Sequence, residues 1–398
     1  MRLSRRGRAS QPTPPPRCVR DRSARLLPLS DTPRNAPRSA ALLALTLTLA
    51  LALAPTRLTH LLPLSLHLSS QEASASPWLL PPGTLVVSGR YDYAMADQEF
   101  LADTGTLQAF PLRGRYIANA YTLGARLGLS ERFELEMSLP MKVVSFRSDP
   151  VILQQSPGVG VEAFDDYQDS IISFNQSEVG LGDLSVTSRF SLTTHPIATS
   201  IEVSLSAPTG YQPPEGTFGS KPSSADEFVE RAGEVARPEN IRDDVTLGDG
   251  VFSFTPTFHM GIGSSFGFFT RASLGFRLRN QGAGDQLVSE AKVGYFLTPW
   301  MLVYGGVYHE LTVSKGRVIG ISVAADDPTL PARDYTGTNN LKLIQVTLDR
   351  DLLATPVGLL LKPLPMVDLT LTYSPILSGR NVAKSSSVSV GVNIVSSY

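Results

Sequence analysis

The sequence predicts an all-β protein: a transmembrane antiparallel β-barrel of about 12 strands that follows an N-terminal signal segment. Three observations predict this fold class. Apolar and polar residues alternate along many segments, these segments are long, and long connections alternate with short ones. The composition agrees, because charged residues make up only 18% of the chain while the mean hydropathy is +0.01. Strands that alternate apolar and polar residues average to such a neutral value, whereas membrane helices do not.

The N-terminal segment, residues 1–76, has the organisation of an export signal. It carries eleven arginines and three acidic residues, and residues 40–54 form an apolar run of 15 residues. A spanning helix needs about 20 such residues, so a helical anchor is the weaker alternative. Small residues follow at Ala73-Ser74-Ala75, in the A-x-A pattern of a cleavage site. We therefore predict a removable signal segment over 1–76, with its cleavage position left open, and a barrel over 83–398.

The remainder of the chain is acidic. Beyond residue 76 there are 35 − 11 = 24 basic and 36 − 3 = 33 acidic residues, a net charge of −9. This balance argues against a nucleic-acid partner. The single cysteine, Cys18, lies in the predicted signal segment, and a mature chain without thiols fits an oxidising compartment. The predicted location is the outer membrane, with membrane lipid, lipopolysaccharide and a small solute as partners. The sequence indicates no cofactor and leaves the oligomeric state open.

Alternation with a period of two dominates beyond residue 80. In the final segment Val388, Val390, Val392 and Ile394 share one face with the terminal Tyr398, while small and polar residues occupy the other. Most such segments run 10–14 residues, whereas soluble strands average about 5–6. The segment 300–313 is apolar on both faces, so its register is ambiguous. We predict segments that begin near residues 84, 115, 133, 183, 197, 251, 266, 286, 300, 340, 366 and 386.

The predicted connections alternate in length. The odd-numbered connections are mostly long, as at 148–182, 209–250 and 314–339, and the even-numbered ones are short. The tenth connection, 353–365, is the exception. Long outer loops with short inner turns are typical of outer-membrane barrels, and an even strand number places both termini on the periplasmic side.

Four short motifs carry a resemblance to a known family. The motifs are Gly180-Leu181-Gly182-Asp183-Leu184, Ala207-Pro208-Thr209-Gly210, Leu247-Gly248-Asp249-Gly250, and the hairpin that begins Gly128-Leu129-Ser130-Glu131-Arg132. With these motifs the chain resembles the outer-membrane transporters grouped with the meta-pathway of phenol degradation, over roughly residues 83–398. The resemblance implies an outer-membrane barrel, and the family's grouping implies passage of aromatic or apolar compounds.

If the apolar faces meet lipid, the opposite faces line a lumen that carries charges of both signs. Mixed signs indicate pairing across strands, whereas a ladder of one sign would indicate a charge-selective pore. The cluster of Arg271, Arg277 and Arg279 on one strand is the best candidate for contact with an anionic solute. The candidate pore-lining residues are Arg126, Glu134, Glu136, Glu202, Arg271, Arg277, Arg279 and Glu290.

Other kinds of site find little support. The acidic residues within 162–169 and 226–244 lack the spacing of a calcium loop, so a solvated or lipopolysaccharide-facing surface is favoured. The five histidines form no HExxH motif, and no phosphate-loop spacing occurs. The sequence therefore predicts neither an enzyme nor a metal site. Residues 209–250 are long enough to fold inward as a constriction.

The first hypothesis is thus an outer-membrane channel that lets a small solute pass by diffusion, with apolar or aromatic compounds as one candidate class. The alternative is a non-conducting structural or adhesion barrel whose surface loops are functional. A soluble secreted β-protein is the third.

Overall fold

The structure is a computed structural model that describes residues 77–101, 104–110, 113–149, 151–152, 171–172, 175–211, 245, 247–280, 282–325 and 341–397. The predicted signal segment, the terminal Tyr398 and both acidic loop clusters lie outside the described residues. Among the residues described, no helix has the length and apolar character needed to cross a bilayer.

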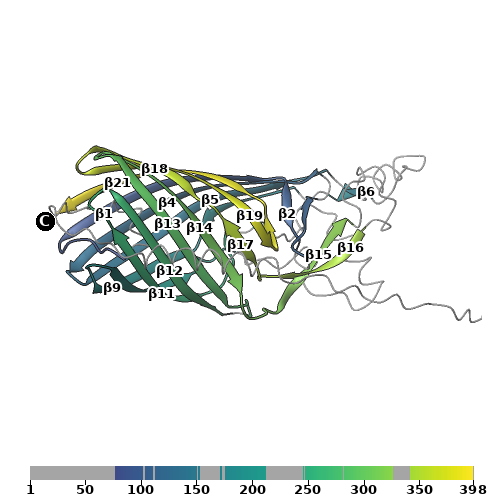
Figure 1. Cartoon of the computed structure of the whole chain (residues 1–398). Coiled ribbons are helices and arrows are strands. Elements are labelled where there is room, and N and C mark those ends of the chain that lie inside the picture. The colour runs from purple at the N-terminus through teal and green to yellow at the C-terminus, as the bar shows by residue number, and fades with distance from the viewer. Residues whose placement is uncertain are drawn as a thin grey trace, which may run out of the picture.

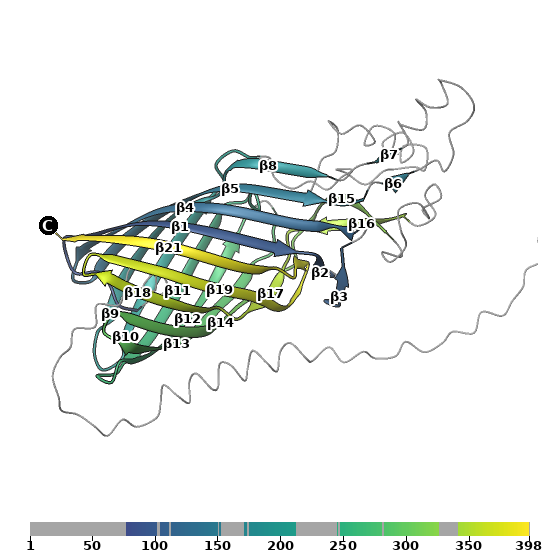
Figure 2. The ribbon, with the colours of Figure 1, turned by 90° about the horizontal axis from the view of Figure 1, so that it is seen from above.

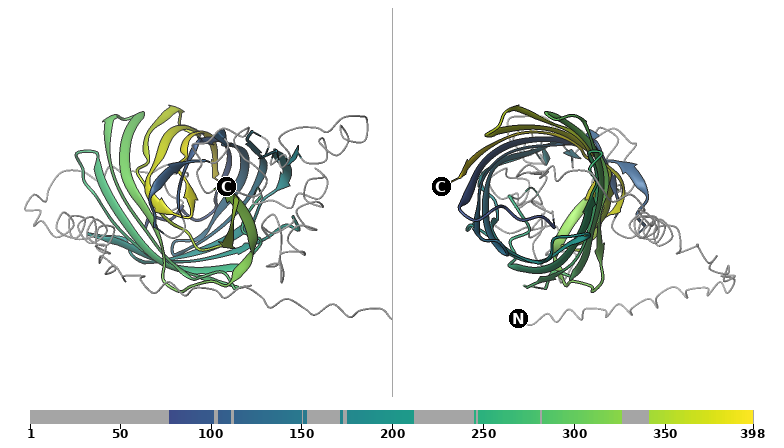
Figure 3. Two further views of the ribbon diagram at one scale, coloured as in Figure 1. Left: turned by 90° about the vertical axis from the view of Figure 1, so that its right-hand side faces the viewer. Right: turned by 60° about the vertical axis from the view of Figure 1, so that its left-hand side comes forward.

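A closed ring of 12 antiparallel strands forms the molecule, which confirms the predicted fold class (Figures 1 and 3). The strands follow one another around the ring in chain order, and β1 closes it by pairing with β21. The strands are β1 (Thr84–Ala96), β4 (Arg115–Ser130), β5 (Phe133–Arg147), β9 (Leu184–Thr193), β10 (Ala198–Ala207), β11 (Ser253–Gly263), β12 (Phe268–Arg279), β13 (Gln286–Thr298), β14 (Met301–Thr312), β18 (Val357–Leu364), β19 (Val367–Arg380) and β21 (Ser386–Ser397).

Some shorter strands pair with the wall, and others lie in the connections. β8 (Gln176–Leu181) pairs with β5 just before β9, and β17 (Asp351–Ala354) pairs with β14 and β19 just before β18. Three small sheets lie outside this ring. They comprise β2 (Gln98–Phe100) with β3 (Leu107–Ala109) and β20 (Val382–Ala383), β6 (Val151–Ile152) with β7 (Ile171–Ile172), and β15 (Val318–Ala325) with β16 (Leu341–Thr347).

The two ends of the barrel differ, as predicted. At one end the strands join through the short connections 131–132, 194–197, 264–267, 299–300 and 365–366. We call this the short-turn end, and the last strand, β21, finishes there (Figure 2). The other end, the long-loop end, carries the long connections together with β2, β6 and β15.

The strand predicted near residue 340 is present, but contrary to the prediction it does not belong to the barrel wall. Leu341–Thr347 forms β16, which pairs only with β15 in the ninth connection. The tenth wall strand is instead β17 followed by β18, and β18 lies within the range 353–365 that was predicted to be a connection. The true tenth connection is therefore only residues 365–366, and the exception in the alternation of lengths disappears.

β18 escapes the sequence pattern because it is apolar on both faces. Leu360 points inward and is fully buried, while Leu359 and Leu361 occupy the opposite face. β14, the strand of ambiguous register, behaves alike: Leu302 and Tyr304 are buried inside the barrel. The interior is apolar at these strands, so inward and outward positions do not differ in polarity there.

The outer surface of the barrel is predominantly apolar. The predicted apolar face of the last strand is exposed, with Val388, Val390, Val392 and Ile394 between 38% and 52% accessible. Comparable side chains on other strands include Leu123, Met137 and Phe258. Such a continuous apolar exterior is unfavourable in water and is the surface that a barrel presents to lipid.

Candidate functional site

The barrel interior near the short-turn end is organised by ion pairs. Arg189 lies between Glu134 and Glu202, with Nη1 2.9 Å from Glu134 Oε1 and Nη2 2.5 Å from Glu202 Oε2. Arg126 Nε lies 3.1 Å from the same Glu134 oxygen, and Glu136 lies 3.9 Å from Arg189. The side chains of Arg126, Glu134 and Arg189 are only 1–4% exposed. These charges neutralise one another inside the wall.

The strand register explains the cluster. Glu134 on β5 stands directly opposite Arg189 on β9, and Arg189 stands opposite Glu202 on β10. Arg126 on β4 stands opposite Glu136. Opposite charges at facing positions stabilise a sheet, and removing one member of a buried pair costs about 3–5 kcal/mol. These four strands are therefore joined through their inner faces as well as through their backbones.

The arginine cluster of β12 is also engaged with acids. Arg271 lies 3.7 Å from Glu290, and Arg277 Nη1 lies 2.9 Å from Glu310 Oε1. Arg279 faces Asp249 at 3.4 Å and Asp349 at 4.0 Å. All eight candidate residues thus point into the barrel and have partners of opposite charge. Contact between them and a solute stays a prediction.

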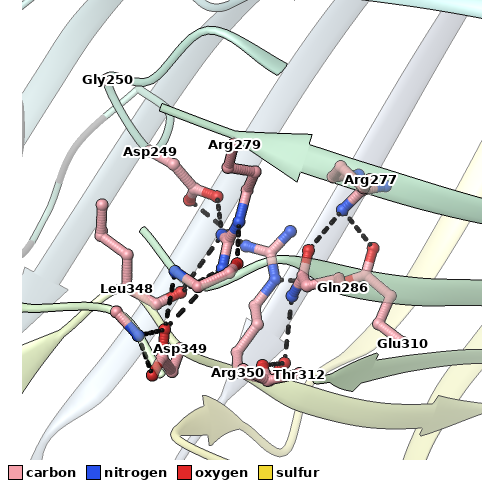
Figure 4. A network of polar contacts seen from close by, with 12 residues as sticks. Asp249, Gly250, Arg277, Arg279, Gln286, Glu310, Thr312, Leu348, Asp349 and Arg350 are labelled. Carbon is pink, nitrogen blue, oxygen red and sulfur yellow. Dashed lines mark hydrogen bonds and ion pairs between the residues drawn. The ribbon is translucent and has the colours of Figure 1, made fainter. Parts of the chain in front are cut away.

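Part of this polar network was missed from the sequence. Arg350 Nε lies 3.1 Å from Glu310 Oε2, and its Nη1 lies 3.4 Å from Asp249 Oδ1 (Figure 4). Asp349 accepts hydrogen bonds from the backbone N–H groups of Gly284 and Gly316. Glu310 was missed because its strand had an ambiguous register, and Arg350 because its segment was read as a wall strand. Glu310 shares a strand face with Leu302 and Tyr304, and a single acid on this predominantly apolar segment was the feature that could have revealed it.

A second part of the interior is apolar, and it lies nearer the short-turn end than Arg277, Arg279 and Glu310 do. Phe269, Leu302, Tyr304 and Leu360 form a buried cluster, and Trp78 and Phe296 pack against it. The Trp78 and Phe269 rings meet edge to face, with centroids 6.5 Å apart and planes at 89°, a favourable aromatic geometry. Side chains of β12, β13, β14 and β18 therefore form an apolar patch on the inner wall.

The segment that precedes β1 occupies this patch. The backbone N–H of Leu80 donates to Glu134 Oε2 at 2.7 Å, which ties the segment to the ion-pair cluster. Gly261 makes room for it, because a Cβ there would come 2.8 Å from both Pro77 Cγ and Trp78 Cη2. Residues 77–80 thus lie inside the barrel and narrow its short-turn end. Trp78 precedes the predicted start of the barrel at residue 83, and the alternation pattern gave no sign of its role.

Metal-binding geometry is not seen among the described residues. The parts of the chain that the structure describes contain no group of three or more His, Cys, Asp or Glu side chains that could hold a metal ion.

Comparison with known proteins gives a likeness in structure only. No family model matches the chain, and no curated protein matches it either. Among solved structures, the COG4313 outer membrane channel from Pseudomonas putida F1 aligns with 80% of this chain and 97% of that chain, with a TM-score of 0.51 and 12% identity. The chain shares the fold of that channel. At this identity the likeness establishes the fold alone.

Two other barrels are more remote. The NanC porin aligns with 78% of this chain and 98% of that chain, at a TM-score of 0.37 and 8% identity. The CymD monoaromatic hydrocarbon channel aligns with 80% of this chain and 89% of that chain, at a TM-score of 0.34 and 9% identity. At these TM-scores neither carries an argument about this chain. The resemblance to the meta-pathway transporters stays a prediction.

Proposed function

We propose that this chain is an outer-membrane channel through which a small solute diffuses passively, and that it is not an enzyme. The observation that carries the proposal is the division of the wall: an apolar outer surface encloses an inner face of ion-paired and hydrogen-bonded side chains. A barrel in lipid needs the first, and an aqueous path needs the second. Residues 1–76 would serve as the export segment that brings the chain to this membrane.

The apolar patch supports a finer proposal about the solute. Phe269, Leu302, Tyr304 and Leu360 are buried beneath Trp78, and Trp78 is itself only partly buried, so aromatic surface stays accessible at the narrowed short-turn end. An apolar or aromatic molecule gains free energy when it leaves water for contact with such a surface, and charged groups offer it no such gain. We propose apolar or aromatic compounds as the solute class, in agreement with the resemblance to the meta-pathway transporters. The eight candidate residues would line the remaining polar part of the path.

Replacing Trp78 tests the channel. Purified protein in planar bilayers is expected to give stepwise currents, and Trp78→Ala is expected to give larger steps because the indole narrows the short-turn end. Trp300→Ala is the matched control: it removes the only other tryptophan, which is 53% exposed in the turn between β13 and β14.

The outcomes separate the hypotheses. Equal steps in wild type and Trp78→Ala would show that the indole does not limit the path. The absence of steps from both proteins, each folded and inserted, would favour the non-conducting structural or adhesion barrel.

A further inference from the structure

A segment from the long connection between β10 and β11 lies inside the barrel at the long-loop end. It comprises Val245 and Leu247–Gly250, which we call the strap. Val245 and Leu247 are only 8% and 4% exposed, and they pack against Val144 on the inner face of β5. Tyr116 and Phe146 complete this apolar contact.

Specific contacts fasten the strap to the wall at β5 and β8. Lys142 Nζ donates to the Leu247 carbonyl oxygen at 2.6 Å. Gly180 leaves the space that the Leu247 side chain fills, since a Cβ there would lie 2.7 Å from Leu247 Cδ1. Tyr211 completes the attachment: its hydroxyl donates to Asp183 Oδ1 and accepts the backbone N–H of Gly250 at 2.9 Å.

The tyrosine is held in its donor form. Burial and the hydrogen bond to Asp183 both raise the pKa of the Tyr211 phenol, so it stays protonated at neutral pH. Gly180 contacts Leu247, and Tyr211 joins Asp183 to Gly250. The motifs Gly180–Leu184 and Leu247–Gly250 are far apart in sequence, and through these contacts they form a single attachment.

The strap also reaches the far side of the barrel. Asp249 pairs with Arg279 on β12 and with Arg350 beside β17, each at 3.4 Å, and Arg350 pairs with Glu310 on β14 (Figure 4). β14 lies six strands from β5 in either direction around the ring of 12. Contacts from Lys142 through Leu247, Asp249 and Arg350 to Glu310 thus run from one wall to the opposite wall.

We propose that the strap forms a second constriction, at the long-loop end, and that Asp249 and Arg350 determine its charge selectivity. Their side chains are 31% and 36% exposed, whereas Arg126, Glu134 and Arg189 at the short-turn end are 1–4% exposed. A passing ion therefore reaches Asp249 and Arg350, where a single charge changes the local potential strongly. The inference rests on the proposed function as a channel.

The first test measures ion selectivity in a salt gradient across planar bilayers. Asp249→Asn leaves Arg279 and Arg350 without their shared acid, so the reversal potential is expected to shift toward anions. Arg350→Gln is expected to shift it toward cations. Glu131→Gln, which removes an exposed acid in the turn between β4 and β5, is the matched control and is expected to leave the reversal potential unchanged. Each variant is first shown to be folded on a gel, where the unheated protein should migrate faster than the boiled protein. Reversal potentials equal to wild type in both Asp249→Asn and Arg350→Gln would overturn the proposal.

The second test locates the strap without any current. In the double variant Gly180→Cys/Leu247→Cys, oxidation is expected to form a disulfide, detected by mass spectrometry of the linked peptides. The control pair is Gly89→Cys/Leu247→Cys, because Gly89 faces outward beside Val392 and is expected to give no disulfide.

The two tests together separate two kinds of failure. A folded Gly180→Cys/Leu247→Cys protein that forms no disulfide would overturn the strap and leave the channel standing. A disulfide in a protein that never conducts would refute the channel, and the selectivity role with it, while the position of the strap would hold.

Discussion

At the scale of the residue, Glu134 connects three parts of the barrel interior. One carboxylate oxygen faces both Arg126 and Arg189, and the other accepts the backbone N–H of Leu80. The side chain is 1% exposed, so water does not screen these contacts. Glu134 therefore joins the wall strands to the segment that narrows the short-turn end.

Glu134→Gln is expected to destabilise the barrel by about 3–5 kcal/mol, because two buried guanidinium groups lose a charged partner. The measurement is the temperature at which the folded band on an unheated gel converts to the unfolded band. Glu131→Gln, in the exposed turn just before β5, removes the same charge and is expected to convert at the wild-type temperature. An unchanged conversion temperature for Glu134→Gln would mean that the cluster contributes nothing to stability.

At the scale of the element, the polarity of the interior decides which strands the sequence reveals. Most wall strands alternate, since their inner faces carry charged or small residues and their outer faces are apolar. β14 and β18 do not alternate because Leu302, Tyr304 and Leu360 point inward and form part of the patch on which Trp78 packs. β16 alternates on either side of Leu343-Ile344 and yet lies outside the wall. Alternation thus indicates a strand whose two faces meet surroundings of different polarity, and such a strand need not belong to a barrel wall.

Single-cysteine labelling distinguishes β16 from β18. Gln345→Cys is expected to react on intact cells with a membrane-impermeant maleimide, because Gln345 is exposed on β16 at the long-loop end. Leu359→Cys is expected to stay unlabelled, since it lies on the outer face of β18 between β14 and β19 and would be covered by lipid. The only native cysteine is Cys18, in the predicted signal segment. The reverse pattern would restore the strand predicted near residue 340.

At the scale of the whole molecule, closure depends on the pairing of the first and last wall strands. β1 and β21 pair continuously from Thr84 opposite Ser397 to Met95 opposite Ser386. This ladder leaves neither strand with an open edge along that length. Open edges are very costly in lipid, because unpaired backbone groups find no water there.

The closed ring is expected to resist detergent until heated. On a gel of the detergent-extracted membrane fraction, the unheated protein should migrate faster than the boiled protein. A chain truncated before residue 386 lacks β21 and cannot close, so it should show no such shift. A single unshifted band recovered from the soluble fraction for the full chain would contradict the barrel in the membrane.

The pattern of residues along the chain was enough to predict the fold class and eleven of the twelve wall strand positions. Each follows from a local rule, since neighbouring side chains on a strand point to opposite sides and lipid accepts only the apolar side. The cross-strand ion pairs then follow once the register is set.

Only the tertiary structure placed β18, the packing of Trp78 and the strap. Each depends on contacts between residues far apart in the chain: Trp78 with Phe269, Leu247 with Val144, and Arg350 with Asp249. No periodic pattern records such contacts, because they arise only when the ring closes and brings inward-facing side chains of distant strands together.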